Sequence, residues 1–168
     1  MPSELSLALA TVLAYLLGSI PFGVLLARRR GVDVREAGSG NIGATNVART
    51  VGKRLGAVVL ALDAAKGAAP LGLFLYADLG IGGPSWTPIA LGLAPIIGHC
   101  FSPWLGFAGG KGVATSLGVV LIVEPAVAGV AIVVFAAVYG IFRVASVASL
   151  TGAALIPPLF WFFGPGPV

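Results

Sequence analysis

Two short segments of the sequence combine glycines with polar or basic side chains, a composition typical of phosphate-binding loops. The first loop, residues 38–49, begins GSGNIGATN and ends at Arg49. Glycines let backbone N–H groups approach an anion closely, short hydroxyl and amide side chains add donors, and arginine offers a planar fork of donors. The alternative is an Asn/Gly-rich turn followed by an arginine that only marks the cytoplasmic side of a membrane. The candidate ligands are Gly38, Ser39, Gly40, Asn41, Gly43, Thr45, Asn46 and Arg49.

The second loop, residues 102–112, reads SPWLGFAGGKG and precedes an apolar segment. Its lysine would add a full charge to the partial positive charge of a helix N-terminus beginning near residue 112. It is not a Walker A motif, because Leu105 stands in place of the first glycine and Gly112 in place of the magnesium-binding Ser or Thr. The alternative is a flexible turn at the membrane edge with a snorkelling lysine. The candidate ligands are Gly109, Gly110, Lys111 and Gly112.

The first loop also contains the pattern G-x-G-x-x-G, and Asp63 lies twenty residues after Gly43, as a dinucleotide-binding fold would require. That motif has mechanical meaning only between a buried strand and a helix. Here the preceding residues, RRRGVDVREA, are too highly charged for a central strand, and Asp63 lies inside a long apolar run. We therefore reject the dinucleotide interpretation.

Three further ionisable residues are secondary candidates. Asp63 and Lys66 are three residues apart in an apolar run, so on a helix they would share a face and could pair inside a membrane. The pair could take part in function, or it could be an ion pair that only helps helices to pack, and both interpretations stay open. His99 is the only histidine and could be a general base or a hydrogen-bonded spacer. With one histidine and one cysteine, no cluster has the spacing of metal ligands, and we expect neither a metal nor a cofactor.

Ser146 and Ser149 are also three residues apart and follow Arg143. On a helix they would share one face. They could line a site, or they could simply allow helices to pack closely, as small residues do in membranes.

The composition indicates a membrane protein. The chain has 168 residues, of which 58% are hydrophobic and only 10% charged, whereas globular domains carry about 25% charged residues. Seven of its ten Lys and Arg lie between Arg28 and Arg54. One basic cytoplasmic loop explains this clustering better than a nucleic-acid-binding face, so we expect no nucleic-acid partner. The single cysteine, Cys100, excludes an intramolecular disulfide framework.

Six apolar segments predict an all-α, polytopic membrane fold that forms a single domain over residues 1–168. A transmembrane helix needs roughly 17–25 mostly apolar residues. Residues 113–123 are a short segment, closed by Glu124–Pro125, and their crossing is the doubtful one. The predicted segments are 5–27, 55–76, 86–101, 113–123, 126–142 and 144–163.

The charge distribution predicts an orientation. The N-terminal region carries Glu4 and no base, and Arg28 and its neighbours follow the first apolar run, so we expect no cleavable signal peptide and an N-terminus outside. Segments 28–54 and 102–112, and the junction at 143–149, then lie in the cytoplasm, and the chain ends outside. If residues 113–123 were re-entrant, Arg143 would move outside, which the positive-inside rule disfavours.

Taken together, the motifs resemble one family, the bacterial acyl-phosphate:glycerol-3-phosphate acyltransferases of the PlsY type. The likeness covers nearly the whole chain in order, and the GSGN and GGKG blocks are highly specific. The motifs are GSIPFG at 18–23, GSGNIGATNVART at 38–50 with Gly52, LD..KG..P at 62–70, GH.F.P with GF.GGKGVATSLG at 98–118, and SVASL at 146–150.

The resemblance implies an inner-membrane enzyme with its active site facing the cytoplasm. It would transfer a fatty acyl group from acyl phosphate to glycerol 3-phosphate, giving 1-acyl-glycerol 3-phosphate and phosphate, the first acylation in bacterial phospholipid synthesis. Its partners would be these two substrates, membrane lipid and the enzyme that supplies acyl phosphate. By motif position, Ser39, Arg49 and Lys111 would bind substrate phosphates, with a contribution from Ser146 or Ser149.

One departure from the family pattern leaves alternatives open. The family adds a seventh helix and a cytoplasmic tail with a third motif, whereas this sequence ends at FFGPGPV, which predicts a form without that motif. The rival interpretation is a transporter of phosphate or an organic anion, for which Lys66 is the best sign. A third is a membrane subunit without catalytic activity.

Overall fold

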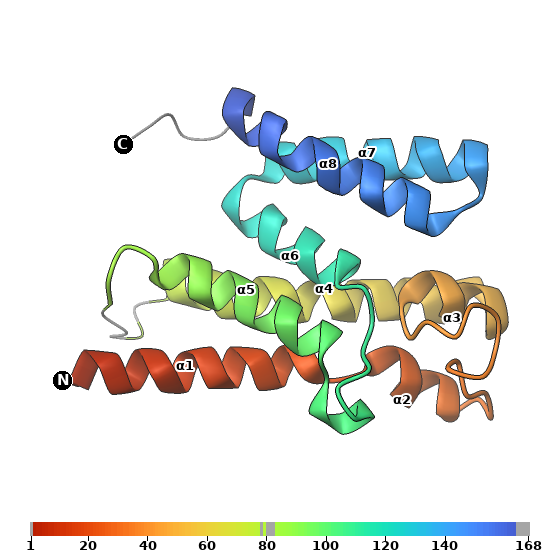
Figure 1. Cartoon of the computed structure of the whole chain (residues 1–168), viewed down its shortest axis with the longest axis horizontal. Helices are drawn as coiled ribbons and strands as arrows, with labels where there is room; N and C mark the ends of the chain where they lie inside the picture. Colours follow the sequence, from red (N-terminus) through yellow and green to blue (C-terminus); the bar gives the residue numbers. More distant parts are fainter. Residues whose placement is uncertain (1, 78, 80–82, 164–168) are drawn as a thin grey trace. The chain divides into compact units, whose positions relative to one another are not determined.

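In the computed structural model, residues 2–77, 79 and 83–163 are described, and the regular elements among them are all helical (Figure 1). The predicted all-α membrane fold is confirmed. The elements are α1 (Pro2–Ser19), α2 (Phe22–Arg28), α3 (Ala44–Thr50), α4 (Lys53–Tyr76), α5 (Thr87–Cys100), the 3₁₀ turn η1 (Pro103–Leu105), α6 (Val113–Val123), α7 (Pro125–Phe142) and α8 (Ala145–Phe163).

Five stretches of the described chain are long and apolar enough to cross a membrane, and they match five of the six predicted segments. The short segment at 113–123 forms α6, an apolar helix of 11 residues. At 1.5 Å per residue it is about 17 Å long, roughly half the hydrocarbon thickness. The count of six crossings therefore stays a prediction. The five stretches are Glu4–Arg28, Lys53–Tyr76, Thr87–Leu105, Pro125–Phe142 and Ala145–Phe163.

The chain divides into two compact units, with the boundary between Val119 and Val120 inside α6. The first unit contains α1 to α5 and the start of α6, and the second contains the end of α6 with α7 and α8. The single domain over 1–168 stays a prediction. The expected position of the chain's end concerns residues 164–168, which lie outside the described residues.

In the first unit, α1 and α5 pack along each other and run in the same direction (Figure 1). Glycines make this close approach possible. A Cβ on Gly18 would overlap the backbone of Pro95, and one on Gly98 would overlap the backbone oxygen of Tyr15. Because both helices run one way, their C-terminal ends, and the segments that follow them, meet at the same end of the unit.

The first membrane stretch, Glu4–Arg28, is broken toward its C-terminal end, at Ile20 and Pro21. Helix α1 ends at Ser19 and α2 begins at Phe22. Proline lacks an N–H and clashes with the preceding turn, so it ends the helix there. The break leaves backbone carbonyl groups without helical partners inside an apolar stretch.

In the second unit, α7 and α8 form a helical pair. Their contact is built from small residues, with Ala128, Ala131, Ala148 and Gly152 buried. Arg143, the residue predicted to mark the cytoplasmic side, ends α7 in a left-handed conformation with φ 58°.

The close packing of α1 on α5 gives a first prediction. Gly98→Ala places a methyl group against a backbone oxygen that cannot rotate away, and we expect it to lower the free energy of unfolding by about 1–3 kcal/mol. Gly129→Ala is the matched control, because the space around Gly129 in α7 is open and alanine favours a helix. Thermal unfolding in detergent measures both, and equal midpoints would contradict this packing.

Candidate active site

The first and second loops are anchored in one apolar cluster. Buried residues of α2, of the segment that leads into the first loop, of the first loop itself and of α4 form this cluster, and Leu105 of η1 packs against it. A Cβ on Gly23 would overlap the backbone oxygen of Ile42, so α2 lies directly against the first loop. The structure therefore brings the two predicted loops together in the first unit. The buried members are Val24, Ala27, Val34, Ile42, Val47 and Val59.

Asn46 organises the first loop. Its side-chain Nδ2 donates to the backbone oxygens of Val34 (2.9 Å), Ala37 (3.0 Å) and Asn41 (2.9 Å). Its Oδ1 accepts from the backbone N–H of Ser39 at 2.9 Å, and the residue is only 3% exposed. All four contacts hold backbone in place, so Asn46 shapes the loop whatever it contributes to a ligand.

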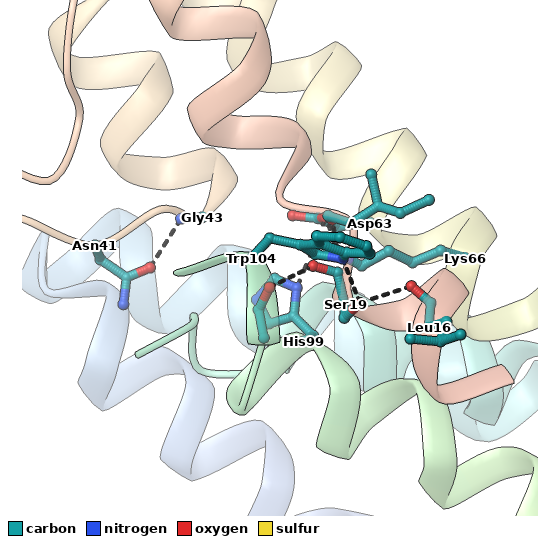
Figure 2. A network of polar contacts seen from close by, with 10 residues as sticks. Leu16, Ser19, Asn41, Gly43, Asp63, Lys66, His99 and Trp104 are labelled. Atoms are coloured by element: carbon teal, nitrogen blue, oxygen red, sulfur yellow. Dashed lines mark hydrogen bonds and ion pairs between the residues drawn. The ribbon is translucent and has the colours of Figure 1, made fainter. Parts of the chain in front are cut away.

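The backbone conformation of the first loop explains why glycine occupies several of its positions. Gly38 and Gly40 have φ of 62° and 71°, the left-handed region that favours glycine. The backbone N–H of Gly43 donates to Asn41 Oδ1 at 2.8 Å, which forms a tight turn before α3 (Figure 2). The Ser39 side chain is exposed.

Two arginines beside the first loop are paired. Asp33 accepts from Arg35 at 2.6 Å and from Arg28 at 3.2 Å. The hydrogen bonds from Arg35 hold the pKa of the Asp33 carboxyl well below its usual range. Arg49, in the last turn of α3, is exposed and makes no ion pair within the described part of the chain. Of these three arginines, Arg49 is the one available to an anionic ligand.

In the second loop, the glycine segment lies across the end of α5. The backbone N–H of Gly109 donates to the oxygen of Cys100, and that of Gly110 donates to the oxygen of His99, both at 3.0 Å. These two N–H groups are therefore engaged within the protein. Lys111 follows directly and is exposed. The assignment of Gly109 and Gly110 as phosphate ligands stays a prediction. The structure shows instead that both glycines pack against the end of α5.

Asp63, Lys66 and His99 form a buried polar cluster in the first unit (Figure 2). Lys66 Nζ lies 2.8 Å from Asp63 Oδ1, and both side chains are 2% exposed, so the predicted pairing of these two residues is confirmed. His99 Nδ1 lies 3.7 Å from the same oxygen. His99 Nδ1 has no hydrogen-bond partner among the described residues, and Asp63 Oδ1 is held by its ion pair with Lys66.

The break in the first span is held by side chains from α4 and from the second loop. Lys66 Nζ donates to the backbone oxygen of Ile20 at 2.7 Å, and Ser102 Oγ donates to that of Ser19 at 2.7 Å. Ser19 Oγ donates to the oxygen of Leu16 and accepts from Trp104 Nε1, both at 2.7 Å (Figure 2). Sequence reasoning missed Ser102 and Trp104, although a proline break predicts that some donors must satisfy the freed carbonyls.

Ser146 and Ser149 lie on α8 in the second unit. Ser149 Oγ donates to the oxygen of Ala145 at 2.7 Å, a contact within its own helix. Their contribution to a site with the loops of the first unit stays a prediction. Among the described residues, no three His, Cys, Asp or Glu side chains are grouped in a way that could hold a metal ion.

The role of Asn46 gives a second prediction. Asn46→Ala removes four hydrogen bonds, each worth about 0.5–1.5 kcal/mol net, so we expect the free energy of unfolding to fall by about 2–4 kcal/mol. The control, Asn41→Ala, removes only the side-chain contact to Gly43. Chemical unfolding in detergent should show the larger loss for Asn46→Ala, and similar losses would contradict its central place in the loop.

Comparison with known proteins shows which family this chain resembles. A family model described as "Glycerol-3-phosphate acyltransferase" matches residues 8–168. The glycerol-3-phosphate acyltransferase of Myxococcus xanthus is 55% identical over 146 residues, covering 85% of this chain and 73% of the relative. That of Aquifex aeolicus is 46% identical over 157 residues, covering 94% and 80% respectively. The chain thus spans about three quarters of the length of these relatives.

Solved structures give the same result. The crystal structure of PlsY (YgiH), an integral membrane glycerol 3-phosphate acyltransferase, in its glycerol 3-phosphate form has a TM-score of 0.86 and 42% identity, covering 95% of this chain and 78% of that one. The lysophosphatidic acid form has a TM-score of 0.84 with the same identity and coverage. With the same helical membrane architecture and both loop motifs in place, this chain belongs to the glycerol-3-phosphate acyltransferase family of integral membrane enzymes.

Proposed function

We propose that this enzyme transfers a fatty acyl group from acyl phosphate to the sn-1 hydroxyl of glycerol 3-phosphate, giving 1-acyl-glycerol 3-phosphate and inorganic phosphate. The observation that carries the proposal is the pair of loops on one apolar cluster, which present Arg49 and Lys111 as exposed cations. Both substrates carry phosphate. The solved PlsY structures in glycerol 3-phosphate and lysophosphatidic acid forms support the same substrate and product here.

Each loop has a role in this proposal. Ser39 donates a hydrogen bond from its hydroxyl to a substrate phosphate, and Arg49 closes on that phosphate with its planar fork. Lys111 neutralises charge on the other phosphate, which becomes the leaving group. Gly38, Gly40 and Gly112, with φ of 62°, 71° and 73°, let the backbone fold closely around these groups. By motif position, Ser146 or Ser149 also contributes to substrate binding.

The chemistry needs no covalent enzyme intermediate. An acyl phosphate is already activated, because phosphate leaves readily. The hydroxyl oxygen of glycerol 3-phosphate attacks the acyl carbonyl carbon, the carbon–oxygen bond to phosphate breaks, and a phosphate oxygen of the substrate takes the hydroxyl proton. The protein supplies orientation and charge stabilisation.

The membrane setting extends the proposal. The apolar helices place the protein in a membrane, and we assign it to the bacterial inner membrane with its N-terminus outside and both loops in the cytoplasm. There the enzyme that supplies acyl phosphate would be a natural partner, since its product is both reactive and lipid-soluble.

One assay tests the proposal against its alternatives. Purified protein in detergent receives radiolabelled glycerol 3-phosphate and palmitoyl phosphate, and the lipid extract is measured for label. We expect labelled 1-acyl-glycerol 3-phosphate. Label that crosses the membrane of reconstituted vesicles without entering lipid would indicate a transporter, and neither signal would indicate a subunit without catalytic activity.

The proposed role of Lys111 gives a third prediction. Lys111→Ala should lower kcat/KM by roughly 30- to 1000-fold, because about 2–4 kcal/mol of charge stabilisation is lost in the transition state. Lys111→Arg should restore activity only in part, since a planar fork does not replace a compact charge. Initial rates at varied substrate concentrations measure both. Unchanged kinetics in Lys111→Ala would reduce the residue to a marker of topology.

The proposed orientation gives a fourth prediction. In a Cys100→Ser background, a cysteine replacing Ser85, between α4 and α5, should react with a membrane-impermeant thiol reagent in intact cells. A cysteine replacing Glu36, near the first loop, should react only after the membrane is permeabilised. Both native residues are exposed, so access within the protein is matched. The reverse pattern would invert the topology.

A further inference from the structure

The buried cluster of Asp63, Lys66 and His99 takes no part in the proposed chemistry, yet its construction is costly. Removing two charges from water costs several kcal/mol per ion, and well-packed apolar residues of similar volume often serve stability equally well. The cluster also leaves His99 Nδ1 without a hydrogen-bond partner among the described residues, which is rare for a buried polar atom. A contribution to stability alone therefore does not explain why these three residues are buried here.

On one side, the cluster holds the break in the first span. Lys66 Nζ donates to the oxygen of Ile20 at 2.7 Å and lies 5.5 Å from the ring centroid of Phe22, the first residue of α2. Asp63 Oδ1, at 2.8 Å from the same nitrogen, balances its charge. The position of α2, and of the first loop packed against it, therefore depends on this lysine.

On the other side, the cluster meets the glycine segment of the second loop. His99 Nδ1 faces Asp63, and a Cβ on Gly110 would overlap His99 Nε2. The backbone oxygen of His99 also accepts from the N–H of Gly110 at 3.0 Å. The ring and the backbone of one residue thus fix Gly110, and Lys111 is the next residue along the chain.

We propose that Asp63, Lys66 and His99 are positioning residues, which set the second loop against the broken first span and so place Lys111 for acyl transfer. This inference rests on the proposed function. The contacts form a continuous path from Ile20 through Lys66, Asp63 and His99 to Gly110. The glycine at position 110 is required by the histidine ring, which explains part of the GGKG motif without a ligand.

The test replaces the pair by apolar residues of similar size, because a single change would leave a buried charge without a partner. In the variant carrying both Asp63→Leu and Lys66→Met, we expect a folded protein with a thermal midpoint moderately below that of the wild type, because the Ile20 oxygen loses a donor. We expect kcat/KM to fall by roughly 10- to 100-fold, as for a small displacement of a catalytic group. Thr87→Val, a buried polar change at the far end of α5, is the control and should keep activity within about twofold of the wild type.

The same double change in a Lys111→Ala background separates positioning from a general loss of structure. If the cluster acts through Lys111, the additional loss there should be less than about threefold. An equal factor in both backgrounds, or unchanged activity in the first, overturns the proposal. Should the double variant fail to fold, His99→Gln is measured in both backgrounds with the same two criteria.

A second readout does not need turnover. Hydrogen exchange at the amides of Gly109 and Gly110 should be faster in the double variant than in the wild type, with exchange in α7 unchanged. Unaltered exchange at these glycines overturns the inference. If the wild-type protein showed no acyl transfer, the proposed function would fail, while the exchange result would still decide whether the cluster fixes the second loop.

Discussion

The hydrogen bond from Lys66 to the backbone oxygen of Ile20 is the contact on which the site depends most. Pro21 breaks the first membrane stretch, and carbonyl groups freed inside an apolar stretch need donors from the protein. A lysine can serve there only if its charge is balanced, which Asp63 does from one helical turn away. The break is what lets the chain turn from α1 into α2 and carry the first loop.

Glycine serves two separate purposes around this break. Gly38 and Gly40 provide left-handed backbone in the first loop. Gly98, Gly109 and Gly110 instead allow backbone or ring atoms of neighbouring segments to approach, because a Cβ at each would overlap another group. A glycine-rich motif beside a membrane can therefore reflect close packing as much as the binding of an anion.

The helices were predictable because apolar runs of membrane-spanning length leave the chain few alternatives. The Asp63–Lys66 pair was predictable because it depends on local spacing. The approach of His99 to Asp63 was not, since it depends on how α5 packs on α4. The central role of Asn46 could not be predicted either, because its hydrogen-bond partners lie up to twelve residues away. These partners are backbone groups, which any residue type would offer. Likewise, sequence alone suggested free N–H groups at Gly109 and Gly110, which the fold engages with the end of α5.

The central claim is that the first and second loops act on the substrates in one site. A double-variant cycle of Arg49→Ala and Lys111→Ala, measured as kcat/KM for acyl transfer by the purified protein, tests it most directly. If both side chains act in one site, the double variant should be less impaired than the product of the two single factors, by about fivefold or more. Two factors that simply multiply would show that the loops act independently and would contradict a shared site.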